Sequence, residues 1–205
     1  MAFTPLTLDA ARLCDGLSRI GYVPPEAIIN LIENAVTANA KNVIAVIVSE
    51  NGERSSIREY LIIDDGVGMD QPGIKNALTL GSAASQATAG TASKLGFGLK
   101  NAAFSQGDTL EVLSSSGDSI FIKYRVALKD VRAQGVYGAE RVELTSEDEA
   151  LIREHLHAGR GTIVRITHIR QSNNFSIEAT IKEIHRQISD LYSPEYQSHI
   201  QVLSQ

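Results

Sequence analysis

The feature that most constrains the fold is a pair of strands that ends in a glycine turn. Residues 41–50 are rich in β-branched side chains and are followed by an Asn-Gly dipeptide, a strong hairpin signal. The chain returns through the apolar run at residues 57–65, and Gly66 and Gly68 come directly after it. This pattern predicts a buried strand whose backbone turns sharply at its end, because glycine tolerates conformations closed to other residues.

The spacing of apolar residues predicts the other elements. Helices are expected over residues 7–20, 25–39, 70–80, 96–104, 147–157 and 177–192, and further strands over 109–116, 119–128, 162–169 and 199–203. Ser146 with Glu149 is expected to cap the fifth of these helices, and residues 129–145 are ambiguous. The order predicts an α+β fold, a two-layer sandwich in which helices cover one face of a mixed, mostly antiparallel sheet. We expect one domain over 1–176, with 177–205 packed on it or leading to a further module.

Composition narrows the class of protein. The 205 residues suffice for one well-cored domain, and a net charge of −5 lacks the basic footprint of a nucleic-acid binder. Cys14 is the single cysteine, which excludes an internal disulfide and CxxC zinc sites. The chain shows neither a secretory signal nor an apolar stretch of about 20 residues, so we expect a cytoplasmic protein without a membrane span.

The helix at 25–39 carries an unusual polar face. Its members share one side of the helix by their spacing: Glu26, Asn30, Glu33, Asn34 and Thr37. Asparagine is a poor helix former, so the pair Asn30 and Asn34 is unexpected within a helix. One interpretation is a solvated face. The other is that an asparagine carbonyl oxygen binds Mg²⁺, a hard cation that prefers oxygen ligands.

The glycine turn begins with an acidic residue at the end of an apolar strand. Burying Asp64 there is costly unless its charge has a use. Its carboxylate suits a hydrogen bond from the exocyclic amine of adenine, while Gly66 and Gly68 let the base approach the backbone and Met69 offers an apolar contact. The alternative is an ordinary turn that contains an aspartate.

A second glycine turn lies at the start of the helix at 96–104. Gly96, Phe97 and Gly98 put free backbone N–H groups at a helix N-terminus, which favours anions, and Lys94 and Lys100 add positive charge. The preceding segment of small polar residues is expected to act either as a lid or as a plain connection.

The last motif is a Gly-Thr pair that opens the apolar strand at 162–169. The Thr162 hydroxyl could link a base, Asp64 and a water molecule. The pair is common by chance, and its value comes from standing last in the series.

In this order, Asn30–Asn34, Asp64–Gly68, Gly96–Gly98 and Gly161-Thr162 resemble the four motifs of the GHKL superfamily, over about residues 20–170. That superfamily includes DNA gyrase B, heat-shock chaperone ATPases, histidine kinases and MutL. Within the superfamily, the sequence of residues 73–85 and 94–116 is most similar to MORC-type ATPases, including their prokaryotic relatives, and to heat-shock-chaperone-like ATPase domains. The resemblance implies the Bergerat fold, with ATP and Mg²⁺ as ligands.

The resemblance also implies roles for single residues. Asn34 matches the Mg²⁺-binding amide and Asp64 the acid that reads adenine. The other implied contacts fall into two groups: Ala38, Gly68, Met69 and Thr162 around the base, and Gly96, Gly98, Leu99 and Lys100 at the phosphates.

Two positions depart from the family pattern. Hydrolysing members carry a glutamate as general base four residues before the metal-binding asparagine, and here that position is Asn30, whose amide cannot accept a proton. Glu33 and Glu26 are the candidates to replace it, and slow or absent turnover is the stronger expectation. Ser93 stands where many relatives have a glycine, which loosens the match at the phosphate turn.

Three functions remain open. The first is an ATP-driven conformational switch that recruits a protein partner, a further domain or a second copy of the chain. The second is phosphotransfer of the histidine-kinase type, which Asn30 favours, although no upstream helix with a phosphoacceptor histidine is present in this sequence. The third is a non-enzymatic module that binds ATP or ADP.

Overall fold

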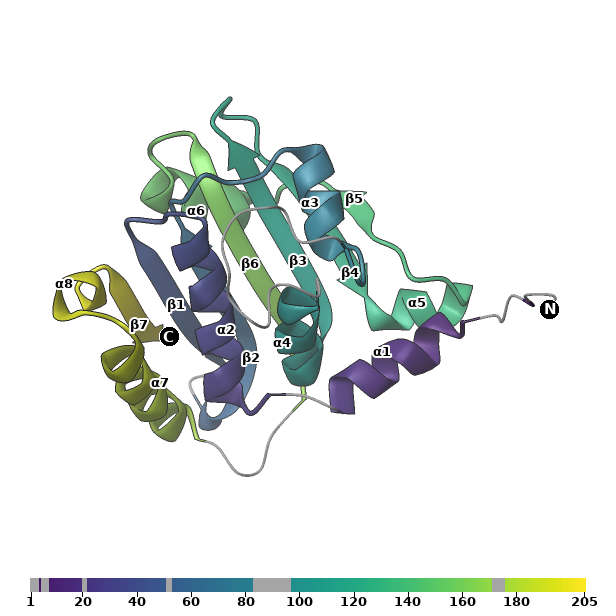
Figure 1. Cartoon of the computed structure of the whole chain (residues 1–205), viewed down its shortest axis with the longest axis horizontal. Coiled ribbons are helices and arrows are strands. Elements are labelled where there is room, and N and C mark those ends of the chain that lie inside the picture. The colour runs from purple at the N-terminus through teal and green to yellow at the C-terminus, as the bar shows by residue number, and fades with distance from the viewer. Residues whose placement is uncertain (1–3, 5–7, 20–21, 51–52, 83–96, 171–175) are drawn as a thin grey trace.

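A computed structural model describes residues 4, 8–19, 22–50, 53–82, 97–170 and 176–205 of the chain (Figure 1). The described strands are β1 (Val43–Glu50), β2 (Glu53–Asp64), β3 (Gly107–Ser116), β4 (Ile122–Ala127), β5 (Glu140–Val142), β6 (Arg160–Ile169) and β7 (Ile200–Ser204). The described helices are α1 (Ala10–Arg19), α2 (Pro24–Thr37), α3 (Gln71–Leu78), α4 (Gly98–Gln106), α5 (Leu128–Gln134), α6 (Ser146–His155), α7 (Ile177–Leu191) and α8 (Pro194–Gln197).

The strands form one mixed sheet in the order β5-β4-β3-β6-β2-β1-β7. Neighbouring strands are antiparallel, apart from β1 and β7, which are parallel. Together with the helices this confirms the predicted α+β sandwich with a mostly antiparallel sheet. The ambiguous segment 129–145 supplies most of α5 and the short edge strand β5.

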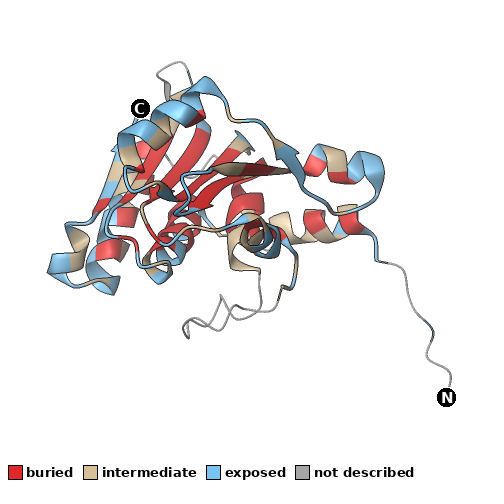
Figure 2. Cartoon of the chain, turned by 90° about the horizontal axis from the view of Figure 1, so that it is seen from above, coloured by how far each residue is buried: buried red, intermediate tan, exposed pale blue. Residues whose placement is uncertain are grey.

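The larger core lies between the sheet and the helices packed on one of its faces. It joins Ile28 and Ile32 of α2, Phe104 of α4 and Ile184 of α7 to strand residues such as Ile62. Pro24 and Pro25 occupy the first turn of α2, where a missing N–H costs nothing. Figure 2 shows the buried residues gathered on the strands and on the inward sides of the helices.

The opposite face of the sheet carries a smaller core under α6. Residues that alternate with those of the main core point to this side, among them Leu61, Ile63 and Ile163, and Leu156 packs against them. The structure thus adds one helix on the face that the sequence interpretation had left uncovered.

A network of buried charges lies on this same side. The Lys123 ammonium contacts the carboxylates of Glu111 at 2.8 Å and Asp148 at 2.9 Å. Arg165 contacts Asp148 at 3.3 Å and Glu59 at 3.4 Å. Because each charge faces opposite charges, these side chains can remain buried beneath α6.

The prediction for the N-terminus of α6 was wrong by one residue. Thr145 caps the helix: its hydroxyl accepts from the Asp148 N–H at 3.1 Å, and the Asp148 carboxylate accepts from the Thr145 N–H at 2.9 Å. Ser146 and Glu149 do not form the box. The contact with Lys123 holds the Asp148 carboxylate in the interior. The capping box therefore forms with Thr145 and Asp148, one residue before the predicted pair.

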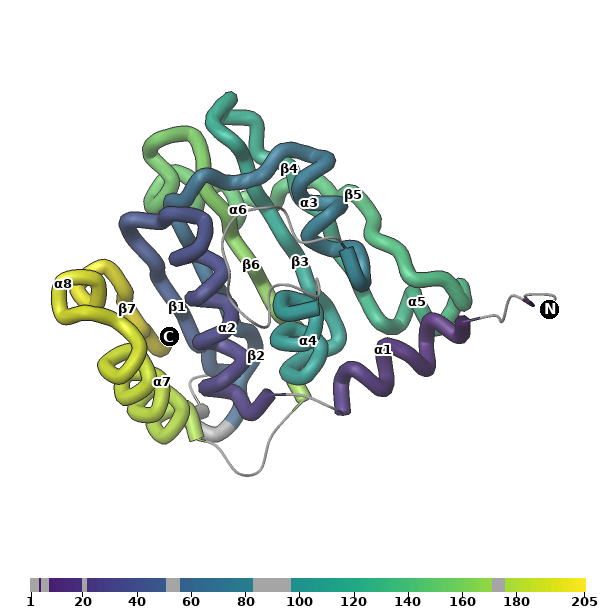
Figure 3. The backbone as a smooth tube through the Cα atoms, in the orientation of Figure 1, coloured from purple at the N-terminus to yellow at the C-terminus, as the bar shows by residue number. Residues whose placement is uncertain are grey.

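The last elements complete the sheet at the β1 edge (Figure 3). Strand β7 pairs with β1, and α7 packs on α2. Tyr196 of α8 donates a hydrogen bond to the Ala40 carbonyl oxygen at 2.9 Å, and the Val43 N–H donates to the His199 carbonyl oxygen at 2.9 Å. The segment between α2 and β1 is therefore braced from the C-terminal side. Among the described helices, none combines the length and the apolar character needed to cross a bilayer.

Candidate functional site

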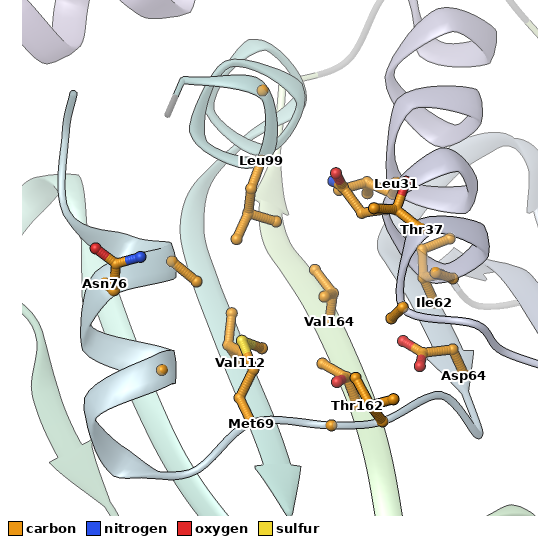
Figure 4. Close-up of a pocket in the computed structure, with 18 of the residues that line it drawn as sticks. Leu31, Thr37, Ile62, Asp64, Met69, Asn76, Leu99, Val112, Thr162 and Val164 are labelled. Atoms are coloured by element: carbon orange, nitrogen blue, oxygen red, sulfur yellow. The ribbon is translucent and has the colours of Figure 1, made fainter. Parts of the chain in front are cut away.

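A cavity of about 410 Å³ opens on the helix-covered face of the sheet (Figure 4). Strands β2, β3 and β6 form its floor through Ile62, Val112 and Val164, and helices α2, α3 and α4 form its walls. Asp64 and Thr162 lie at one end, and Leu99 of α4 lies toward the other (Figure 4). An apolar cavity with a few polar groups at defined places is typical of a small-molecule site.

Asp64 is the main polar group of this cavity. It ends the buried strand β2, it is only 6% exposed, and its Oδ1 accepts a hydrogen bond from the Gly66 N–H at 2.9 Å. Burial raises the pKa of the Asp64 carboxyl to about 7, and the negative charge of Asp65 adds to the effect. The carboxylate therefore gains from any ligand that donates a hydrogen bond to it.

The turn after Asp64 fits only glycine at two positions. Gly68 has a φ of +65°, and a Cβ there would lie 1.8 Å from the Ser115 carbonyl oxygen. A Cβ at Gly66 would lie 2.7 Å from the Ala38 carbonyl oxygen, which accepts the Val67 N–H at 2.9 Å. The turn is thus pressed between the end of α2 and β3, and Gly68 forms part of the cavity wall.

A hydroxyl of β3 supports the same end of the cavity. Ser114 pairs in register with Thr162, and their side-chain oxygens lie 2.9 Å apart. The Ser114 hydroxyl also donates to the Gly161 carbonyl oxygen at 2.7 Å and accepts from the Met69 N–H at 2.8 Å. The sequence analysis missed Ser114, because nothing near it in the sequence sets it apart from the serines that follow.

The polar face of α2 divides between the cavity and its surroundings. Asn34 and Ala38 line the cavity, whereas Asn30 and Glu33 are not among its lining residues. Asn30 is 8% exposed, and its Oδ1 has no hydrogen-bond partner within the described residues. Glu33 is exposed at the surface, but partial desolvation by the neighbouring protein still raises the pKa of its carboxyl. Its charge acts on Tyr192 just after α7.

The α4 wall contains part of the predicted phosphate turn. Gly98, Leu99 and Lys100 line the cavity, and Phe97 is the residue before the helix. Lys94 and Gly96 lie outside the described residues. Lys100 is buried, and its ammonium donates a hydrogen bond to the Ala77 carbonyl oxygen of α3 at 2.7 Å.

The structure therefore brings most of the predicted site residues to one cavity. Those that line it are Asn34, Ala38, Asp64, Gly68, Met69, Gly98, Leu99, Lys100 and Thr162. Gly66 lies behind the turn against Ala38. The sequence analysis did not name the wall made by α3, including Asn76 and Ala77, because its members are ordinary helix residues.

One lining residue carries an oxygen of the kind that Mg²⁺ prefers as a ligand. Asn34 offers an amide oxygen at the wall, and within the described residues no three His, Cys, Asp or Glu side chains group into a metal site of their own. Mg²⁺ commonly takes one or two protein ligands and completes its shell with phosphate oxygens and water.

Comparison with known proteins identifies the family. No curated protein matches the chain. The family described as histidine kinase-, DNA gyrase B-, and HSP90-like ATPase matches residues 22–162, well over half of the chain and the stretch from α2 to the first residues of β6. Asn34, Asp64, Gly68 and Thr162 all fall within the match. The chain therefore belongs to the histidine kinase-, DNA gyrase B-, and HSP90-like ATPases, the GHKL superfamily of ATP-binding domains.

Proposed function

We propose that the chain binds Mg-ATP in this cavity and acts as an ATP-driven conformational switch with slow or absent hydrolysis. The observation that carries the proposal is that Asp64, Thr162, Asn34 and the first turn of α4 all line one cavity of suitable volume. The family membership supports ATP as the ligand.

The adenine end is assigned to the glycine turn. Asp64 accepts a hydrogen bond from the exocyclic amine, and Thr162 lies beside it in register. Met69 and Ala38 supply apolar contacts to the faces of the base. Because Asp64 is ionised above a pKa of about 7, it accepts best at neutral and alkaline pH.

The phosphate end is assigned to α4 and to Asn34. Free N–H groups at the start of α4 favour anions, and Gly98 and Leu99 place that turn at the cavity wall. The Asn34 amide oxygen would bind Mg²⁺, which neutralises phosphate charge when it is bound. The Lys100 ammonium would add positive charge near the phosphates if it gave up its hydrogen bond to the Ala77 carbonyl oxygen. The roles of Lys94 and Gly96 stay predictions from the sequence.

Slow turnover is proposed because the position of the general base is an amide. The Asn30 side chain cannot accept a proton from water, and its buried position keeps it from the cavity lining. Glu33 could accept a proton, but it lies outside the lining on the side toward Tyr192. Neither residue therefore supports a conventional hydrolytic step.

We also propose MORC-like ATPases as the subgroup, and a protein partner, a further domain or an ATP-dependent second copy as the target of the switch. The sequence of residues 73–85 and 94–116 supports the subgroup. A reducing cytoplasm is consistent with the free, buried Cys14.

Calorimetric titration with a non-hydrolysable ATP analogue tests the binding step. We expect binding with Mg²⁺, weaker binding with EDTA, and a loss of at least about 100-fold in affinity in the Asp64→Asn variant, since a charged acceptor is removed. Absence of binding to the natural protein would refute the proposal.

Steady-state ADP release tests the hydrolytic step. We expect a very low rate, and a higher rate in Asn30→Glu if that position can carry the base. A natural rate typical of efficient ATPases would contradict slow turnover. Transfer of labelled phosphate to a protein would favour the alternative of a histidine-kinase-type domain, which the amide at Asn30 supports.

A further inference from the structure

We propose that Ser114 is a positioning residue that fixes the Thr162 hydroxyl as a hydrogen-bond acceptor toward the cavity. The site would thereby select a purine that carries an exocyclic amine over one that carries a carbonyl at the same place. This inference rests on the proposed binding of a nucleotide, and it assigns base selectivity to a residue that does not touch the ligand.

The positions of the protons follow from the partners of Ser114. The Gly161 carbonyl oxygen can only accept, so the proton in its 2.7 Å contact with Ser114 belongs to the Ser114 hydroxyl. The serine oxygen is left with lone pairs, one of which accepts the Met69 N–H at 2.8 Å. The 2.9 Å contact with Thr162 then needs the threonine proton.

Thr162 is therefore left without a proton for the cavity. Its hydroxyl donates toward Ser114 and offers only lone pairs to a ligand. Asp64 is its partner across the β2–β6 pair, and both side chains lie at the same end of the cavity (Figure 4). An ionised Asp64 is likewise an acceptor, so these two side chains present only acceptors to a ligand.

An end made of acceptors suits one kind of purine edge. An exocyclic amine has two hydrogens to donate, whereas a carbonyl oxygen in the same place would face two acceptors without a proton. Leaving such polar groups unpaired in a desolvated site costs about 1–3 kcal/mol, which corresponds to a factor of about 5 to 150 in affinity. A threonine that is free to rotate would donate to the carbonyl and remove part of this penalty.

Ser114 acts through Thr162 and has no direct contact with the cavity. It is 0% exposed and is not among the lining residues. Substitution by alanine removes the acceptor that takes the Thr162 proton. It also removes the acceptor of the Met69 N–H and the donor to the Gly161 carbonyl oxygen, but it leaves the side chains of Asp64 and Met69 in place. A change in the ratio of the two nucleotide affinities, and not in both affinities together, would therefore report on the orientation of the Thr162 hydroxyl.

The neighbouring Ser115 provides a matched control. It is 1% exposed, and its hydroxyl makes three contacts, as that of Ser114 does: 3.0 Å to an Asp118 carboxylate oxygen, 3.0 Å to the Gly159 carbonyl oxygen and 3.4 Å to the Gly117 N–H. As the next residue along β3, its side chain points to the opposite side of the sheet from that of Ser114. The same substitution there costs similar interactions without touching Thr162.

The experiment measures Kd for non-hydrolysable analogues of ATP and GTP with Mg²⁺. It compares the natural protein with Ser114→Ala and Ser115→Ala, and thermal unfolding confirms that each variant folds. We expect the natural protein to prefer ATP, the preference to fall at least about fivefold in Ser114→Ala, and it to stay within about twofold in Ser115→Ala. If Ser114→Ala does not fold, Ser114→Cys fills the space with a somewhat larger sulfur that is a weaker acceptor, and it should lower the preference in the same direction.

Three outcomes would overturn the inference: an unchanged preference in the folded Ser114 variant, an equal loss in Ser115→Ala, or a natural protein that binds both nucleotides alike. These results differ from a failure of the proposed function. If the proposed function fails, the natural protein binds neither analogue. If the natural protein and the Ser114 variant prefer ATP equally, only the role of Ser114 is refuted.

Discussion

The Lys100 ammonium donates a hydrogen bond to the Ala77 carbonyl oxygen at 2.7 Å, and Lys100 as a whole is only 2% exposed. This bond joins α4 to the C-terminal half of α3, two walls of the same cavity. Burial lowers the pKa of Lys100 to about 8, against 10.5 for an exposed lysine. Keeping the Lys100 ammonium charged in this buried position therefore lowers the free energy of unfolding.

This cost predicts an unusual dependence of stability on pH. Between pH 8 and 10.5 the unfolded chain holds a proton on this lysine that the folded chain has lost, so this group makes the free energy of unfolding rise with pH, by at most about 1.4 kcal/mol per pH unit. Urea denaturation across this range should show the rise in the natural protein relative to Lys100→Met. The exposed Lys129→Met serves as control, and parallel curves for the natural protein and Lys100→Met would contradict the prediction.

Asp64→Asn should stabilise the protein without ligand while it weakens nucleotide binding. The folded pKa of about 7 exceeds the ordinary value of 3.8, so the contribution of Asp64 to stability is full below about pH 4 and is lost as the pH rises through 7. At pH 8 the variant removes a buried charge and keeps an oxygen for the Gly66 N–H. We expect a gain of about 1–3 kcal/mol in the free energy of unfolding at pH 8, measured by urea denaturation.

The adjacent Asp65→Asn is the matched control, and its effect should have the opposite sign. Burial acts to raise the pKa of Asp65, but hydrogen bonds from Asn42 and Lys41 outweigh it and lower the pKa. Its carboxylate accepts the Lys41 N–H at 2.7 Å and the Asn42 N–H at 2.8 Å. Loss of this charge should destabilise the protein at pH 8, and a gain there would argue against the electrostatic explanation.

Parts of the candidate site could be predicted because some residue types conflict with their local setting in the sequence. An acid at the end of an apolar strand, followed by two glycines, marked Asp64 and Gly68 without any structure. Asn34 could be named for a similar reason, since asparagine is unfavourable within a helix. In each case the residue type disagrees with its local environment, and that disagreement is visible in the sequence.

Other parts could not be predicted because they depend on contacts between distant segments. Ser114 looks like an ordinary strand serine until β3 and β6 pair and place it against Thr162. The same holds for Lys100, whose burial against Ala77 requires α3 to pack beside α4. The cap at Thr145 was missed because a buried contact with Lys123, and not the local sequence alone, fixes Asp148.

Gly68→Ala should be among the most damaging single substitutions. The added Cβ would combine a left-handed φ of +65° with a position 1.8 Å from the Ser115 carbonyl oxygen, so the turn or β3 must shift. We expect a loss of about 3 kcal/mol or more in the free energy of unfolding, measured by urea denaturation. Gly135→Ala has nearly the same φ, +67°, with nothing within 4 Å of the Cβ, and should cost about 1 kcal/mol. Equal losses would show that strain alone, and not the close approach, explains Gly68.

Lys123→Met should destabilise the protein through the charges it leaves behind. The Lys123 ammonium lies between Glu111 and Asp148, which keep their negative charges beneath α6 when it is removed. Removing one partner of a buried ion pair costs about 3–5 kcal/mol. Chemical denaturation would measure this against Arg125→Met on the same strand, whose ion pair with Glu140 is more exposed and should cost less than about 1 kcal/mol. Similar costs for both variants would contradict a buried network.

Successive side chains of β6 point to opposite faces of the sheet, and this limits which mutations the strand tolerates. Thr162 and Val164 line the cavity on the helix-covered face, whereas Ile163 and Arg165 belong to the smaller core and the ion network beneath α6. Loss or insertion of one residue in the strand would exchange the two sets, placing a guanidinium in the cavity wall and a threonine under α6. A substitution in the strand alters one face at a time, but a single-codon deletion within it would disable both faces at once.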